Sequence, residues 1–208
     1  MHLRLWILLI YILMNLSCIA ASGHSGDWGR DGINMYNVPL LKHEGVKSPD
    51  GKITVAINDE SLALKVGNRF IPLNVIFNPE LSEVLWSSDS RYFTLTVSDG
   101  GWVGTWDTYV IDTKDITTPK IISLRPIIEA VLTKCWMCNG EDAINIGAVS
   151  WRDELRVIVE IPPHSVCNNM GEVKGAVIDV EHGNVIKLMR SEKVYYEWGE
   201  DMGKRFKE

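Results

Sequence analysis

The sequence predicts a mainly β protein, built as an open stack of antiparallel sheets with one helical insertion and a short C-terminal helix. The first observation behind this prediction is a repeated turn sequence, which begins at Trp86, at Trp151 and, in a weaker form, at Ser48. The second observation is that an alternating apolar strand follows each of these turns. Repetition on this scale favours stacked antiparallel units over the α/β sheet that is typical of many enzymes.

The N-terminus has the pattern of a secretory signal peptide, which we assign to residues 1–22. A short basic start at His2 and Arg4 precedes an apolar stretch from Leu5 to Leu16, and small residues follow. The apolar stretch is short for a membrane-spanning helix. An uncleaved anchor and lipidation at Cys18 remain alternatives to cleavage. The pattern predicts a secreted or periplasmic protein, in contact with a membrane only through an uncleaved leader.

Composition limits the classes of partner. The chain carries a formal net charge of −6 and has no basic run or stripe, which argues against nucleic acid and an anionic membrane surface. The glycine-rich residues 23–46 are interpreted as a linker or flexible arm. About 185 residues remain after the leader, enough for one β-rich domain, which we place at 47–208.

Blade-like repeats are expected at about 47–83, 84–125 and 147–190. In the first, Ile53–Ile57 and Leu62–Val66 alternate strictly on either side of a polar turn, which predicts a hairpin. An extended run from Phe70 to Val75 follows, and Pro72 makes an interior position in the sheet unfavourable for it.

The second and third repeats have the same layout. In the second, Phe93, Leu95 and Val97 share one face of a strand, and Tyr109–Asp112 and Lys120–Leu124 are the expected partner strands. In the third, one strand face is formed by Leu155, Val157, Val159 and Ile161. Its other face is formed by Arg156, Ile158 and Glu160.

Two segments have helical spacing. The insertion 126–138 begins with Pro126, which is tolerated in a first turn, and continues with apolar residues at helical intervals. Near the C-terminus, Ser191 is a candidate N-cap, and Val194, Tyr195 and Trp198 form an apolar stripe. Both helices are expected to cover sheet faces or open edges.

The turn sequence Trp86-Ser87-Ser88-Asp89-Ser90-Arg91 resembles the blades of TolB-type and WD40-type β-propellers. Trp151-Arg152-Asp153-Glu154 and Ser48-Pro49-Asp50-Gly51-Lys52 are weaker copies. In such a turn Asp and Ser form a tight Asx-type hydrogen-bonded turn, and the Trp packs between neighbouring sheets. Two or three units are too few to close a ring. The resemblance implies an open binding scaffold, in keeping with a bacterial envelope protein.

Cysteine spacing leaves three interpretations open. Cys135-x-x-Cys138 and His164-x-x-Cys167 have the spacing of zinc ligands, so a zinc site is one alternative. A structural disulfide from Cys167 to Cys135 or Cys138 is the default after export, and no cofactor is then expected. A redox role for the Cys-Trp-Met-Cys sequence is the third alternative. It requires a helix N-terminus at the first cysteine, whereas the expected helix ends there.

Two loops at matching positions of the repeats form the candidate binding surface. One contains Trp102 and Trp106, and the other contains His164, Asn168 and Asn169. Matching loops emerge on the same side of the sheets, and tryptophans on glycine-rich loops suit recognition of proteins, peptides or sugars. The alternative is that these tryptophans fold back onto the sheet.

Catalytic sequence patterns are absent from the chain. We find no nucleophile elbow, metalloprotease helix, phosphate loop or dinucleotide fingerprint. The sequence therefore predicts an exported, non-enzymatic module that binds an unidentified protein, peptide or cell-envelope component. The alternative function is a zinc-binding or thiol-redox protein that uses Cys135, Cys138, His164 and Cys167.

Overall fold

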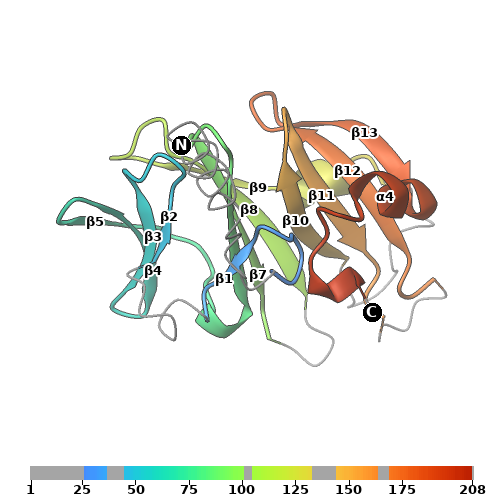
Figure 1. The fold of residues 1–208 in the computed structure, drawn as a ribbon, viewed down its shortest axis with the longest axis horizontal. Coiled ribbons are helices and arrows are strands. Elements are labelled where there is room, and N and C mark those ends of the chain that lie inside the picture. The colour runs from blue at the N-terminus through green and yellow to red at the C-terminus, as the bar shows by residue number, and fades with distance from the viewer. Residues whose placement is uncertain (1–25, 37–44, 101–104, 133–143, 164–168, 208) are drawn as a thin grey trace, which may run out of the picture.

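The computed structural model is mainly β and confirms the expected stack of antiparallel sheets (Figure 1). The structure describes residues 26–36, 45–100, 105–132, 144–163 and 169–207. Three sheets lie side by side across the molecule, and within the described ranges they close into neither a barrel nor a propeller ring. Among the helices of these ranges, none has the length and apolar character that crossing a membrane requires.

The first sheet is a four-stranded antiparallel meander in the order β2-β3-β4-β5. Its strands are β2 (Val46–Lys47), β3 (Thr54–Asn58), β4 (Ser61–Val66) and β5 (Arg69–Pro72). The predicted hairpin is present, with Asn58 paired to Ser61 and a tight turn in which Asp59 and Glu60 have positive φ. As expected from Pro72, β5 is an edge strand, because proline cannot donate to a further ladder.

The second sheet has five strands in the order β1-β6-β7-β8-β9. Its strands are β1 (Ile33–Asn34), β6 (Ser82–Trp86), β7 (Tyr92–Ser98), β8 (Trp106–Asp112) and β9 (Lys120–Ser123), and the short 3₁₀ helix η2 (Pro79–Leu81) precedes β6. Phe93, Leu95 and Val97 are buried in a cluster with Val55 and Leu64 of the first sheet. The period of two in β7 therefore selects the face that packs on the first sheet.

The third sheet is again a four-stranded meander, in the order β10-β11-β12-β13. Its strands are β10 (Asn145–Trp151), β11 (Leu155–Glu160), β12 (Val173–Asp179) and β13 (Asn184–Arg190). The predicted division of β11 into two faces is confirmed. Leu155, Val157 and Val159 pack in a cluster with Val110 of the second sheet, while Ile158 packs in the cluster on the opposite face.

Both α-helices of the described ranges are short. Helix α3 (Arg125–Glu129) buries Ile128 between the second and third sheets, and residues 133–138 of the expected insertion lie outside the described residues. Helix α4 (Ser191–Trp198) buries Val194 and Trp198 on the outer face of the third sheet. A 3₁₀ helix, η3 (Lys204–Phe206), follows it.

The N-cap prediction for α4 was wrong by one residue. Arg190 is the N-cap and makes no side-chain capping hydrogen bond, while Ser191 is already helical. The helix begins directly after the end of β13. In the absence of a polar cap, the packing of its apolar stripe on the sheet determines where the helix starts.

The interface between the second and third sheets contains buried hydroxyls as well as apolar side chains. The hydroxyls of Thr96 and Thr108 lie 3.0 Å apart, and that of Thr108 donates to the carbonyl of Ile146 at 2.8 Å. The amide of Ala148 donates to the Thr96 hydroxyl at 3.2 Å. These directional bonds set the position of β10 against β7 and β8.

The expectation of a linker or flexible arm over 23–46 was wrong for the described part of that range. Trp28 and Met35 are fully buried, and Ile33 of β1 pairs with Val84 of β6. Trp28 packs among aromatic neighbours, and its burial holds the segment against the sheets. The glycines weaken only the side-chain pattern from which the sequence could have predicted this. The expected signal peptide, 1–22, lies outside the described residues.

Candidate functional site

The repeated turn has the same hydrogen bonds in the first two sheets. In the second, the Ser87 hydroxyl donates to Asp89 at 2.7 Å, and the amides of Arg91 and Tyr92 donate back to Asp89 and Ser87. In the first, the hydroxyl of Ser48 and the carboxylate of Asp50 make equivalent bonds. Hydrogen bonds to the carboxylates lower the pKa of Asp89, and lower that of Asp50 to about 2.

The third copy of the turn differs in its polar residues. Arg152 occupies the position that Ser87 has in the second sheet. The turn closes through a backbone hydrogen bond from the Arg152 amide to the Glu154 carbonyl. The Arg152 guanidinium donates to Asp201 at 2.8 Å. The side chains of Asp153 and Glu154 are exposed and have no ion pair with another described residue. Within the described ranges, this turn therefore presents two carboxylates without an ion-pair partner.

The tryptophans of the turn sequence join adjacent sheets, as the resemblance implied. The Trp86 indole N–H donates to the carbonyl of Val46 in the first sheet at 3.4 Å. The Trp151 indole N–H donates to the carbonyl of Leu85 in the second sheet at 3.2 Å. Each tryptophan thus packs against the sheet before its own and satisfies its N–H there.

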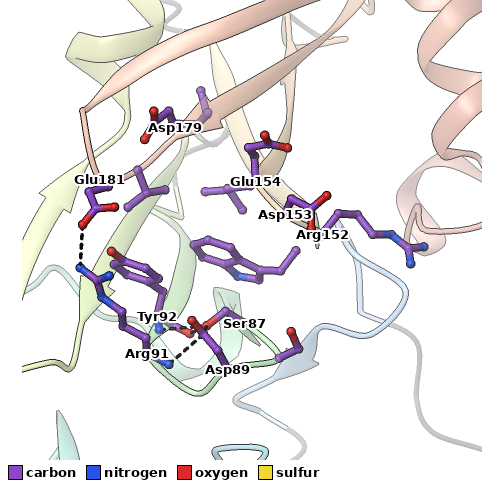
Figure 2. A pocket seen from close by; sticks show the side chains of 14 residues that line it. Ser87, Asp89, Arg91, Tyr92, Arg152, Asp153, Glu154, Asp179 and Glu181 are labelled. Carbon is purple, nitrogen blue, oxygen red and sulfur yellow. Dashed lines mark hydrogen bonds and ion pairs between the residues drawn. The ribbon is translucent and has the colours of Figure 1, made fainter.

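A groove lies between the second and third sheets at the end where these turns gather (Figure 2). It has a volume of about 350 Å³ and is bordered by the β6–β7, β10–β11 and β12–β13 turns. The groove is lined by Ser87, Ser88, Asp89, Arg91, Tyr92, Trp151, Arg152, Asp153, Glu154, Leu155, Ile178, Asp179, Val180 and Glu181. We call this surface the intersheet groove.

Aromatic side chains and an arginine are stacked inside the intersheet groove. The rings of Tyr92 and Trp151 are nearly parallel, 9° apart, with centroids separated by 5.7 Å. The Arg91 guanidinium lies over the Tyr92 ring, 4.6 Å from its centroid. Arg91 also pairs with Asp112 at 3.3 Å and Glu181 at 3.6 Å, and the bond to Asp112 raises the pKa of its guanidinium. The contact of Arg91 with Tyr92 therefore places a charged side chain and its carboxylate partners beside the stacked rings.

The intersheet groove is negatively charged. Its lining contains five carboxylates and only two guanidiniums, those of Arg91 and Arg152. Figure 2 shows Asp153 and Glu154 on one side of the groove and Glu181, paired with Arg91, on the other. Such a surface suits a ligand that presents cationic side chains, because they can contact the carboxylates and the aromatic faces together.

Two of the five predicted binding residues fall within the described ranges. Trp106 begins β8, is half-buried and packs edge-on against Trp28 at 5.8 Å. This is the alternative in which the tryptophan folds back onto the sheet. Asn169 donates to the Glu172 carboxylate at 3.0 Å. The other three residues, Trp102, His164 and Asn168, lie outside the described residues.

The described ends of the two predicted binding loops are connected. The buried Asn145 side chain accepts a hydrogen bond from the Trp106 amide at 3.0 Å and donates to Glu160 at 3.1 Å. Trp106 starts the strand after one loop, and Glu160 ends the strand before the other. The bases of these loops therefore meet at a shared polar contact.

The cysteine set is outside the part of the chain that the structure describes. This applies to Cys135, Cys138, His164 and Cys167, and also to Cys18 in the expected leader. The disulfide, zinc and thiol-redox interpretations consequently stay predictions. Among the described residues alone, no group of three or more histidine or acidic side chains has an arrangement that could bind a metal ion.

Comparisons with protein-family models, with curated proteins and with solved structures found no match to this chain. In the sequence, Arg91 and Trp151 stand out only as parts of the repeated turn, and no pattern marks Glu181 as a groove residue. The available signal was the repeat itself, since hairpin turns at matching positions meet at one end of adjacent sheets.

Proposed function

We propose that this chain is an exported, non-enzymatic β-repeat module that binds a protein, a peptide or a cell-envelope component through the intersheet groove. The observation that carries the proposal is the Arg91–Tyr92–Trp151 stack beside the carboxylates of Asp153 and Glu154, which have no ion pair with another described residue. Export is supported by the N-terminal sequence pattern. The partner that fits best is a segment of protein or peptide with basic side chains.

Two physical arguments support a recognition role. Exposed turns from three separate hairpins border the intersheet groove, and side chains placed by a rigid sheet lose little entropy on binding. Trp and Tyr supply contact area with few rotatable bonds, and carboxylates at the rim steer a cationic partner toward them.

A fluorescently labelled hexalysine peptide is expected to bind the protein at low salt, with affinity that falls as sodium chloride is added. Replacing both free carboxylates, Asp153→Asn with Glu154→Gln, is expected to weaken binding about fivefold, since each exposed pair contributes less than about 1 kcal/mol. Fluorescence anisotropy at two salt concentrations measures both effects.

The control is the double variant Asp59→Asn with Glu80→Gln, which makes the same change in net charge outside the groove. It is expected to bind hexalysine as the wild type does, and a hexaglutamate peptide is expected not to bind. Equal weakening by the two double variants would indicate attraction to overall charge. That result would remove the intersheet groove as the contact surface and direct attention to the loops with Trp102 and His164.

A further inference from the structure

Three arginines of the described residues share one arrangement, in which the guanidinium lies over an aromatic ring and pairs with a carboxylate. The first is in the intersheet groove itself. Arg91 lies 4.6 Å from the centroid of the Tyr92 ring and pairs with Asp112 at 3.3 Å and Glu181 at 3.6 Å. This contact shows how the groove accommodates a guanidinium.

The second arrangement joins β11 to α4. Arg156 lies over the Trp198 ring, 5.5 Å from its centroid, and its guanidinium pairs with the buried Asp201 at 3.3 Å. A guanidinium is planar and more weakly hydrated than an ammonium, so its face can stack on a ring while its edge donates to carboxylate oxygens. The arrangement therefore depends on the shape of the cation as well as on its charge.

The third arrangement is in the C-terminal tail, where Arg205 lies 4.8 Å from the centroid of the Trp28 ring and pairs with Glu160. A lysine makes a looser contact with a ring. The Lys65 ammonium lies 5.9 Å from the Phe70 centroid, farther than each of the three guanidiniums lies from its own ring. Within the described residues, arginine is therefore the cation that packs closely on aromatic rings beside carboxylates.

The intersheet groove contains a second aromatic ring beside carboxylates. Trp151 is half-buried and lines the groove, with its ring 9° from parallel to that of Tyr92. Asp153 and Glu154 follow it in the β10–β11 turn, and both are exposed without an ion pair to another described residue. We call Trp151, Asp153 and Glu154 the turn set. It has the ring and the carboxylates of the arrangement seen around the three arginines.

The two arginines that line the intersheet groove are both engaged away from the turn set. The Arg152 guanidinium donates to the buried Asp201 carboxylate at 2.8 and 3.0 Å. In Figure 2 its side chain extends away from Tyr92 and Glu181. Arg91 lies over Tyr92 and pairs with Glu181. A guanidinium for the turn set therefore has to come from a partner.

We propose that the intersheet groove selects an arginine of its partner over a lysine, with the partner's guanidinium stacked on Trp151 and paired with Asp153 and Glu154. This inference rests on the proposed function, because it names the side chain that the groove recognises in a basic segment. A guanidinium can contact the ring and donate two parallel hydrogen bonds to a carboxylate at the same time. A lysine ammonium is a compact, strongly hydrated charge and keeps mainly the attraction to the carboxylates.

Binding of labelled hexaarginine and hexalysine peptides to the full chain tests this selectivity. The two peptides carry the same charge, and the wild type is expected to bind hexaarginine about tenfold more tightly at the same salt concentration. Fluorescence anisotropy measures both Kd values. Their ratio is the quantity to compare between variants, because attraction between an acidic chain and a basic peptide affects both peptides.

Two substitutions of Trp151 form a matched pair. Trp151→Phe and Trp151→Leu both remove the indole N–H that donates to Leu85, but only the phenylalanine keeps a flat ring. Trp151→Phe is expected to retain a ratio of about fivefold or more, and Trp151→Leu to lower it to about twofold or less. Thermal unfolding confirms that each variant is folded. A ratio near the wild-type value in folded Trp151→Leu would overturn the proposal.

The exposed carboxylates give a second test that leaves the core unchanged. Asp153→Asn with Glu154→Gln is expected to weaken hexaarginine binding more than hexalysine binding, because the guanidinium loses its paired hydrogen bonds as well as the attraction of charge. Equal weakening of both peptides would overturn the proposal. Equal affinities of the wild type for the two peptides would also overturn it, and would leave the proposed function standing. If neither peptide bound at low salt, the proposed function would be contradicted together with this inference.

Discussion

Individual residues of the repeats differ in their structural roles, and Trp106 is the clearest example. Its sequence context, on a glycine-rich loop, suits recognition. In the structure its ring instead packs against Trp28, and its amide donates to the buried Asn145. The free energy of packing for a half-buried indole on a buried one is large enough to decide the orientation of the side chain. Trp106 is therefore expected to contribute to stability.

Replacing Trp106 by alanine is expected to lower the free energy of unfolding by about 2 kcal/mol, because it removes the edge contact with Trp28. Tyr196→Ala is the matched control, since that side chain is 88% exposed on α4 and should change stability by less than about 0.5 kcal/mol. Urea denaturation measures both. If the Trp106 variant were as stable as the wild type, the recognition role that the sequence suggested would be favoured again.

Between elements, the three sheets are joined by two different kinds of contact. The first and second sheets meet through an apolar cluster that includes Val55, Leu64 and Phe93. The second and third also share the bonds between Thr96, Thr108 and the backbone of β10. Apolar contacts tolerate small displacements, whereas hydrogen bonds define one arrangement. We therefore expect the geometry of the intersheet groove to depend on the threonines.

Thr96→Val is expected to destabilise the fold by about 1–3 kcal/mol, because the Ala148 amide and the Thr108 hydroxyl each lose a buried partner while side-chain volume is conserved. Thr94→Val serves as the comparison, since its hydroxyl makes only a 3.4 Å bond to Leu85. Thermal unfolding of the two variants should therefore rank Thr96→Val as the less stable. The reverse order would show that the inter-sheet bonds contribute little.

At the scale of the whole molecule, an open stack leaves two outer faces that a closed ring would bury. On the third sheet, α4 and residues 26–36 cover the outer face through Val194, Trp198 and Trp28. This covering brings residues 26–36 and the residues after α4 together on one face of the third sheet. The bonding state of the cysteines, which lie outside the described residues, is a second property of the whole chain, and an experiment can determine it.

The intact mass of protein exported by its own leader is expected to be that of the cleaved chain, two hydrogens lighter than the fully reduced form and free of metal. The physical reason is that an oxidising compartment favours a disulfide between Cys167 and one of Cys135 and Cys138. Mass spectrometry under denaturing and native conditions, with and without reduction, provides the measurement. A fully reduced chain that retains one zinc would favour the alternative function as a metal site.

Several parts of the fold could be predicted because they depend on local patterns. The β3–β4 hairpin, the two faces of β7 and the hydrogen-bonded turn at Ser87 follow from alternation and from side chains that bond their own backbone. The intersheet groove could be predicted only in part. Arg91 and Trp151 belong to the repeated turn, but their stacking with Tyr92 depends on how two sheets approach each other.

Side-chain alternation in the sequence was enough to predict the mainly β class, the antiparallel stack and the apolar faces of β7 and β11, since these properties depend on the period of side chains along one strand. The packing of residues 26–36, the position of Trp106 and the burial of Glu83 under three amides are visible in the three-dimensional structure alone. These features depend on contacts between residues far apart in the chain. A glycine-rich segment has the same local pattern whether it is free in solvent or wrapped around a carboxylate.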